Sequence, residues 1–134
     1  MRNNRRTWLL LYQLGAGLCD TSTGAMLIAA PAWTFRLMGL HIVPHPIAFV
    51  RFVGVFVLGV GLSYLQPVLR LPMREWRGQW SATAIIRSGV ALLIAWQVAS
   101  GGLERGWLTV AATDAILASV QWAGLSRNWL NFAD

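Results

Sequence analysis

Four long apolar segments, separated by short connections, are the feature that most constrains how this chain folds. They run from about residue 8 to 30, 46 to 66, 80 to 100 and 107 to 125. A helix rises about 1.5 Å per residue and the hydrocarbon layer of a bilayer is about 30 Å thick, so about twenty apolar residues span it. Each segment therefore has the length of a membrane-spanning helix.

The composition also points to a membrane environment. Of the 134 residues, 56% are hydrophobic and only 12% are charged, which lies far from the balance of a soluble domain. The net charge of +6 comes from arginines that lie mainly at the ends of the apolar segments. They form no basic face with interleaved aromatic residues, so nucleic-acid binding is not expected. We predict an all-α fold in which residues 1–134 form one integral membrane four-helix bundle, with the lipid bilayer as its partner.

Helix-breaking residues follow three of the apolar segments. Pro31 follows the first, Pro67 the second, and Gly101 with Gly102 the third, as is typical of helix ends. Residues 32–45, between the first and second segments, are too apolar for a free loop and too few to span a bilayer. This stretch predicts a short interfacial helix.

The arginines predict an orientation, because arginine is retained on the cytoplasmic side of a membrane. Only Arg36 and Arg105 lie in the connections on one side. The other side holds seven arginines: Arg2, Arg5, Arg6, Arg70, Arg74, Arg77 and Arg127. We therefore expect both termini and the middle connection to lie in the cytoplasm, with the protein in the cytoplasmic membrane of a bacterium.

Tryptophans mark the same boundaries. An indole ring suits the headgroup layer of a bilayer because it combines an apolar body with a polar N–H group. Six of the eight tryptophans fall at or near the predicted segment ends: Trp8, Trp33, Trp76, Trp80, Trp107 and Trp129. We expect these side chains to lie at the two membrane surfaces.

Each apolar segment carries one ionisable residue, and these are in order Asp20, Arg51, Arg87 and Asp114. A charge near the bilayer centre costs at least about 2.5 kcal/mol, so such residues normally face the interior of a bundle and pair. We estimate the depth of each residue in the bilayer from a rise of about 1.5 Å per residue, starting at the predicted outer end of its segment. Asp20 then lies at a depth closest to that of Arg87, and Asp114 at a depth closest to that of Arg51.

Three interpretations of these four charges are open. They form a salt-bridge network that fixes helix order, with a shallow arginine snorkelling to the surface. Alternatively, they line a polar pocket for an anionic or quinone-like ligand or form a proton relay, because a carboxylate and a guanidinium in low dielectric shift each other's proton affinity. Binding of a lipid headgroup is the third interpretation.

The sequence carries no signature of catalysis or of a metal site. It has no glycine-rich phosphate loop, no nucleophile elbow and no zinc motif. Cys19 is the only cysteine, and Pro44 and Pro46 break the helix that would align His41 with His45. We expect no catalytic and no metal-ligating residues.

Small residues in the second segment predict a contact outside the chain. Gly54, Gly59 and Gly61 give this segment more small surface than one neighbouring helix needs for close approach. We expect a partner membrane subunit, or a second copy of the chain, to pack there.

These features together resemble the small four-helix bacterial membrane proteins called DoxX-like. The resemblance spans about residues 8–125 and is carried by the proline after the first segment, the run at residues 36–40, Arg51 with the three glycines, Arg87 and the acid Asp114. Members of this group have been linked to quinone-coupled sulfur oxidation or to thiol stress complexes. The resemblance implies a membrane component of a quinone-linked oxidoreductase.

The residues themselves favour a small accessory or ligand-binding membrane subunit that is not an enzyme and needs no cofactor. The alternative is the quinone-linked component, with quinone as its cofactor, or a small transporter built around the four charges.

Overall fold

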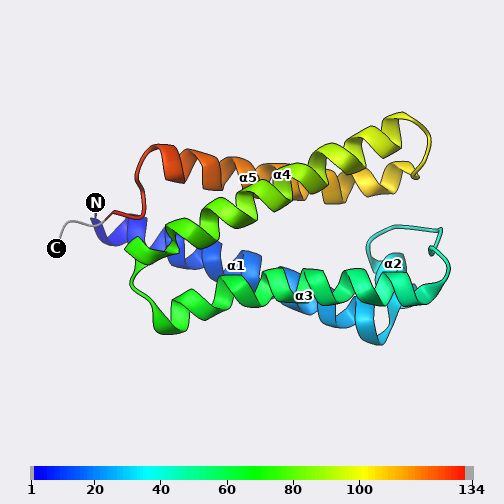
Figure 1. Ribbon diagram of the computed structural model, residues 1–134, viewed down its shortest axis with the longest axis horizontal. Helices are drawn as coiled ribbons and strands as arrows, with labels where there is room; N and C mark the ends of the chain where they lie inside the picture. Colours follow the sequence, from blue (N-terminus) through cyan, green and yellow to red (C-terminus); the bar gives the residue numbers. More distant parts are fainter. Residues whose placement is uncertain (1, 132–134) are drawn as a thin grey trace.

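The computed structural model describes residues 2–131, which are helical and contain no strand (Figure 1). The α-helices are α1 (Arg2–Ala29), α2 (Pro31–Leu37), α3 (Ile47–Arg70), α4 (Arg77–Ala99) and α5 (Leu108–Ser126). Two short 3-10 helices, η1 (Met73–Trp76) and η2 (Arg105–Trp107), precede α4 and α5. The all-α prediction is confirmed for these residues. Met1 and residues 132–134 of the predicted domain lie outside the described residues.

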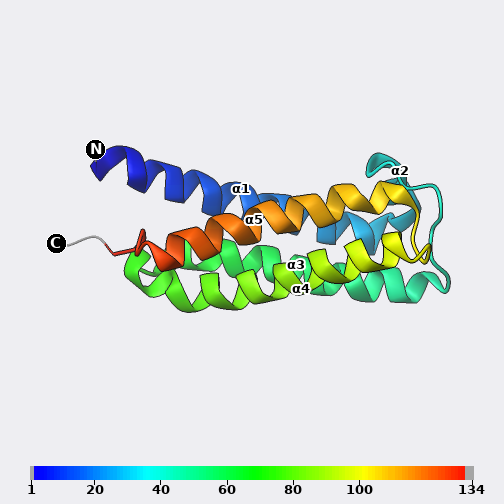
Figure 2. The same cartoon turned by 90° about the horizontal axis from the view of Figure 1, so that it is seen from above.

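The long helices lie in two pairs that run along the molecule. α1 packs against α3, and α4 packs against α5, with the two pairs lying along each other (Figures 1 and 2). Arg5 Nη2 donates to the Asn131 carbonyl at 3.2 Å, so α1 begins beside the segment that follows α5; we call this the terminal end. The opposite end holds α2 and η2, where the rings of Phe35 and Trp107 lie 5.6 Å apart; we call it the α2 end.

Three helical segments are long and apolar enough to cross a membrane: Ile47–Arg70, Met73–Ala99 and Arg105–Ser126. They coincide with the second, third and fourth predicted spans, which indicates a membrane protein. The first predicted span falls on α1, which is 28 residues long but is interrupted by Gln13, Asp20 and the hydroxyl residues at 21–23. The hydropathy of α1 does not reach that of the other three segments, so the expectation that α1 crosses the membrane stays a prediction.

The outer faces of the long helices are apolar. Large hydrophobic side chains that are more than half exposed include Leu11 and Leu18 on α1, Phe52 and Phe56 on α3, Leu92 and Trp96 on α4, and Ile116 on α5. So many exposed large hydrophobic side chains on every long helix are unusual on a soluble monomer. They suit helices that face lipid.

Glycines allow α1 and α3 to approach closely. A Cβ atom on Gly24 of α1 would lie 2.7 Å from the carbonyl oxygen of Gly54, and one on Gly61 would lie 2.8 Å from Cα of Thr21. Gly54 and Gly61 therefore already pack against α1. Of the three glycines predicted to meet a partner, only Gly59 faces open space, with no atom within 4 Å of a Cβ there.

Pro67 does not end the second apolar segment as predicted. It lies inside α3, which continues to Arg70. Proline removes one N–H donor from a helix, but its own carbonyl remains an acceptor. The Pro67 carbonyl accepts the N–H of Leu71 at 2.9 Å, so the last turn is completed after the proline.

Three helices end in the same backbone motif, with a residue of positive φ just beyond the helix: Gly39 (73°) after α2, Gly101 (79°) after α4 and Asn128 (54°) after α5. In each case the next N–H donates back across the last turn, from Leu40 to Phe35, from Gly102 to Gln97 and from Trp129 to Gly124, at 2.8–2.9 Å. This Schellman arrangement satisfies carbonyls that a helix end otherwise leaves without partners.

Two apolar clusters lie at opposite ends of the molecule. At the terminal end, Trp76 and Trp80 are 1% and 0% exposed and pack with Leu9 and Leu130. Two of the six boundary tryptophans, Trp76 and Trp80, therefore pack inside the protein at this end, because burial in this cluster competes with the headgroup layer. At the α2 end a second cluster contains four residues, namely Leu27, Phe35, Leu40 and Val50.

Glu104 joins the two connections at the α2 end. Its carboxylate accepts the backbone N–H of His41 at 2.8 Å and of Ile42 at 3.1 Å, and the His41 ring lies 3.2 Å from it through Nδ1. These contacts hold the pKa of Glu104 below its ordinary value, and the hydrogen bond from the Ile42 N–H has the largest effect. The loop between α2 and α3 is thus tied to the start of η2.

We predict that Gly24→Ala destabilises the protein, whereas Gly59→Ala does not. The new methyl group at position 24 meets α3 backbone, and such overpacking costs about 1–3 kcal/mol. At position 59 the space is open and alanine is the better helix former. Thermal unfolding in detergent measures both variants. Equal melting temperatures for the two would contradict the close α1–α3 packing.

Candidate functional site

Arg87 of α4 joins the two helix pairs. Its guanidinium forms ion pairs with Asp20 of α1 through Nη2 and with Asp114 of α5 through Nη1. Its Nε donates to the Tyr64 hydroxyl of α3 at 2.9 Å, and Cζ lies 5.2 Å from the Tyr64 ring centroid. One side chain therefore contacts all three of the other long helices.

The charges of this triad, Asp20, Arg87 and Asp114, do not balance. The Arg87 side chain is 5% exposed, and those of Asp20 and Asp114 are 16% and 15% exposed. With all three groups ionised, two carboxylates and one guanidinium leave a net charge of −1. A charge without a partner is costly away from water. The triad therefore has capacity for one proton or another positive group beyond Arg87.

Arg51 is not part of this triad. It is exposed and makes no ion pair among residues 2–131. It precedes Tyr64 by thirteen residues, which at 3.6 residues per turn is roughly 220° around α3 and about 20 Å along it. The predicted pairing of Asp114 with Arg51 is wrong, because Arg51 points away from the face that Tyr64 occupies. Its place near the start of α3 suits a side chain that reaches a membrane surface.

A fully buried glutamine organises the next layer, toward the terminal end. Gln13 of α1 donates from Nε2 to the Tyr64 carbonyl at 2.9 Å and to Gln79 Oε1 at 3.0 Å. Its Oε1 accepts the Trp80 indole N–H at 2.8 Å. This side chain connects α1, α3 and α4, as Arg87 does one layer away.

Two further contacts hold α5 in place. Gln121 Nε2 donates to the Thr83 hydroxyl of α4 at 2.7 Å, and the Tyr12 hydroxyl of α1 donates to the Leu117 carbonyl at 2.9 Å. The polar centre between the two apolar clusters thus extends well beyond the ionisable residues.

Sequence reasoning missed these uncharged members, although their spacing carries a signal. Gln13 precedes Asp20 by seven residues, and Gln121 follows Asp114 by seven. Thr83 precedes Arg87 by four. Residues four or seven apart share one face of a helix. Polar residues at those intervals from each buried charge therefore trace the inward face.

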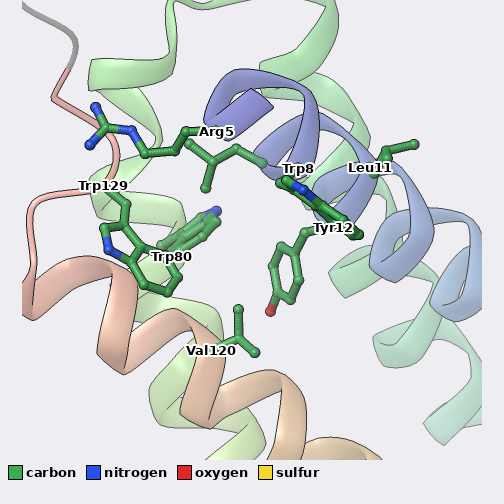
Figure 3. Close-up of a pocket in the computed structure, with 8 residues that line it drawn as sticks. Arg5, Trp8, Leu11, Tyr12, Trp80, Val120 and Trp129 are labelled. Carbon is green, nitrogen blue, oxygen red and sulfur yellow. The ribbon is translucent and has the colours of Figure 1, made fainter. Parts of the chain in front are cut away.

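A cavity of about 810 Å³ lies between α1 and the α4–α5 pair at the terminal end. Trp8 and Tyr12 line it from α1, Trp80 from α4 and Val120 from α5, and Trp129 lines it from the segment after α5 (Figure 3). The Tyr12 and Trp80 rings are 5.2 Å apart. Their polar atoms already hold partners within the protein, so the lining presents mainly ring faces and aliphatic groups.

Metal binding has no support in the described residues, because no three histidine, cysteine, aspartate or glutamate side chains among them lie close enough to share an ion. Comparison of the sequence and structure with protein families, with curated proteins and with solved structures found no match. The geometry alone therefore carries the functional argument.

We predict an order of stability among variants of the triad. Arg87→Gln leaves two buried carboxylates without a cation, which typically costs about 3–5 kcal/mol. Asp20→Asn or Asp114→Asn leaves one carboxylate on Arg87 and costs less. Thermal unfolding in detergent measures the order.

The triple variant Asp20→Asn, Asp114→Asn and Arg87→Gln removes every charge, so we expect it to recover most of the loss. The double variant Asp20→Asn with Arg87→Gln does not recover, since Asp114 remains unpaired. An Arg87→Gln protein as stable as the wild type would show that the triad contributes nothing to the fold.

Proposed function

We propose that this chain is a small ligand-binding accessory subunit of the bacterial cytoplasmic membrane, without catalytic activity of its own. In this proposal α1, α3, α4 and α5 form a bundle that spans the bilayer four times, and α2 lies at the membrane surface. The observation that carries the proposal is the cavity beside α1, whose walls are held in place by hydrogen bonds inside the protein.

The cavity has the properties of a small-molecule site. Ligand pockets are commonly about 300–1,000 Å³, mostly apolar and largely formed before binding. Trp80 is fixed by Gln13 and Tyr12 by Leu117, so two aromatic walls hold their positions through contacts within the chain. Such preorganisation lowers the conformational entropy lost on binding.

The surface supports the proposed placement in a bilayer. On α2, Trp33 and Leu37 are 56% and 59% exposed while Phe35 is 3% exposed, so this short helix has one buried face and one apolar outer face. The arginines gather at the terminal end, which we place in the cytoplasm. Gly59 leaves small open surface on α3 where a partner subunit or a second copy would approach.

The surplus carboxylate of the triad favours a second candidate. A membrane-buried group that can take up a proton is a feature of pumps and transporters, and proton uptake also accompanies quinone reduction. A DoxX-like quinone-linked component or a small transporter would use Asp20 or Asp114 in this way. The identity of a bound molecule separates this candidate from the first.

The topology is tested with single cysteines in a Cys19→Ser background. We expect a cysteine replacing Gly78 to react only with reagent on the cytoplasmic side, and one replacing Gly102 only from outside. The two positions lie at the two ends of α4. Labelling of both from the same side would reject the four-span arrangement.

Ligand binding is tested by native mass spectrometry of protein purified in mild detergent. We expect a bound small molecule on the wild type and its loss in Val120→Phe, which fills the cavity. Ile116→Phe adds a larger side chain one turn away on the exposed surface and should retain the molecule. A bound quinone would favour the second candidate, and equal occupancy in both variants would reject the cavity as the site.

A further inference from the structure

We infer that the cavity beside α1 takes one acyl chain of an anionic phospholipid from the surrounding bilayer, with the phosphate held at Arg5. This inference rests on the proposed ligand-binding function and names the class of ligand. It follows from three properties of the site: the chemistry of its walls, the side on which it opens and the charge at its rim.

The walls select an apolar chain. Tyr12 donates its hydroxyl proton to the Leu117 carbonyl, and Trp80 donates its indole N–H to Gln13. Neither side chain then offers a donor to a ligand carbonyl. Ring faces and aliphatic groups gain free energy by covering methylene groups, at about 0.8 kcal/mol for each one buried. A polar ring system would find no partner for its oxygens between these two walls.

The cavity opens toward the membrane. On α1, Leu9 is 4% exposed and faces the core, whereas Trp8 and Leu11 are 70% and 55% exposed and lie on the outer surface. All three line the cavity. The opening therefore lies between α1 and α5 on a lipid-facing side, and a molecule already in the bilayer reaches it without crossing water.

The cavity has an arginine at its rim and lies at the basic end of the molecule. Arg5 lines the cavity and lies seven residues before Tyr12, about 10 Å nearer the terminal end along α1. Between residues 4 and 131, this end carries one acid, Glu75, against six arginines: Arg5, Arg6, Arg70, Arg74, Arg77 and Arg127. Each arginine near a membrane surface attracts anionic lipid by about 1 kcal/mol. An arginine guanidinium also matches the geometry of a phosphate group.

The C-terminal segment completes the rim. Arg5 Nη2 donates to the Asn131 carbonyl at 3.2 Å, and Arg77 Nη1 donates to Asn128 Oδ1 at 2.9 Å. These two contacts hold residues 128–131 against α1 and α4 and so position Trp129 on the cavity. The guanidinium of Arg5 is thereby fixed beside the entrance.

The test reloads delipidated full-length protein with one of two lipids that share the same chains, phosphatidylglycerol (anionic) or phosphatidylcholine (zwitterionic). Native mass spectrometry counts the lipid retained. We expect the wild type to retain phosphatidylglycerol about fivefold more, the equivalent of about 1 kcal/mol from one arginine. In Arg5→Gln this preference disappears, whereas Arg36→Gln, an arginine change at the α2 end, keeps it. Val120→Phe retains neither lipid, and Ile116→Phe behaves as the wild type.

Three outcomes would overturn the inference, and they separate it from the proposed function. Equal retention of both lipids by the wild type, with loss in Val120→Phe, rejects the anionic headgroup but leaves ligand binding intact. If Arg36→Gln loses the preference for phosphatidylglycerol as Arg5→Gln does, the preference comes from the general surface charge and not from an arginine at the cavity. Retention of neither lipid by the wild type rejects a phospholipid in this cavity, whereas the proposed ligand binding is rejected only if no molecule co-purifies with the wild type. Where Val120→Phe fails to fold, Trp8→Ala removes an exposed wall of the cavity and is expected to retain less phosphatidylglycerol than the wild type.

Discussion

The arrangement of this protein depends on one guanidinium group. The α1–α3 and α4–α5 pairs are each tightly packed, but few backbone contacts link one pair to the other. Arg87 crosses this interface and contacts Asp20, Tyr64 and Asp114. In an apolar medium a charge-assisted hydrogen bond is stronger than in water, and an unpaired charge is more costly. Both effects favour the single relative placement of the two pairs that brings the three charged groups together.

The uncharged neighbours of Arg87 explain how the protein can hold three charged side chains in its interior. Tyr64 uses its hydroxyl for Arg87 and its backbone carbonyl for Gln13, and Gln13 in turn holds Trp80. The buried polar groups thus form a connected network rather than isolated pairs, in which Gln79 Nε2 and Gln121 Oε1 are left without a hydrogen-bond partner among the described residues. Connected polar groups strengthen one another, and each unpaired atom carries a desolvation cost. Because Trp80 is also a wall of the cavity, the same network fixes both the charged centre and the apolar site.

The length of the apolar segments and the composition predicted the helical class and four spans, and three of these four are long and apolar enough to cross a membrane. The sequence also singled out Asp20, Arg87 and Asp114, because charges inside apolar segments are rare and need partners. The predicted pairing of Arg51 with Asp114 was wrong, because a count of depth ignores the direction in which a side chain leaves its helix. The predicted helix end at Pro67 was also wrong, because the helix completes its last turn after this proline. The cavity could not be predicted from the sequence. It forms where side chains of α1, α4 and α5 leave space between the helices, and no single segment determines that space.

The distance in sequence between the members of the triad has a consequence for biogenesis. Asp20 and Arg87 are 67 residues apart, so at a translation rate of about 5–20 residues per second roughly 3–13 s separate their synthesis. During that interval Asp20 of the nascent α1 lacks the cation with which it pairs in the folded protein. In the proposed four-span arrangement, α1 then waits near the headgroups, or enters the bilayer with the carboxyl group of Asp20 protonated, until α4 follows. The least apolar of the four long helices thus precedes its cation in the chain, and in the proposed four-span arrangement its insertion is completed only by a residue translated near the middle of α4.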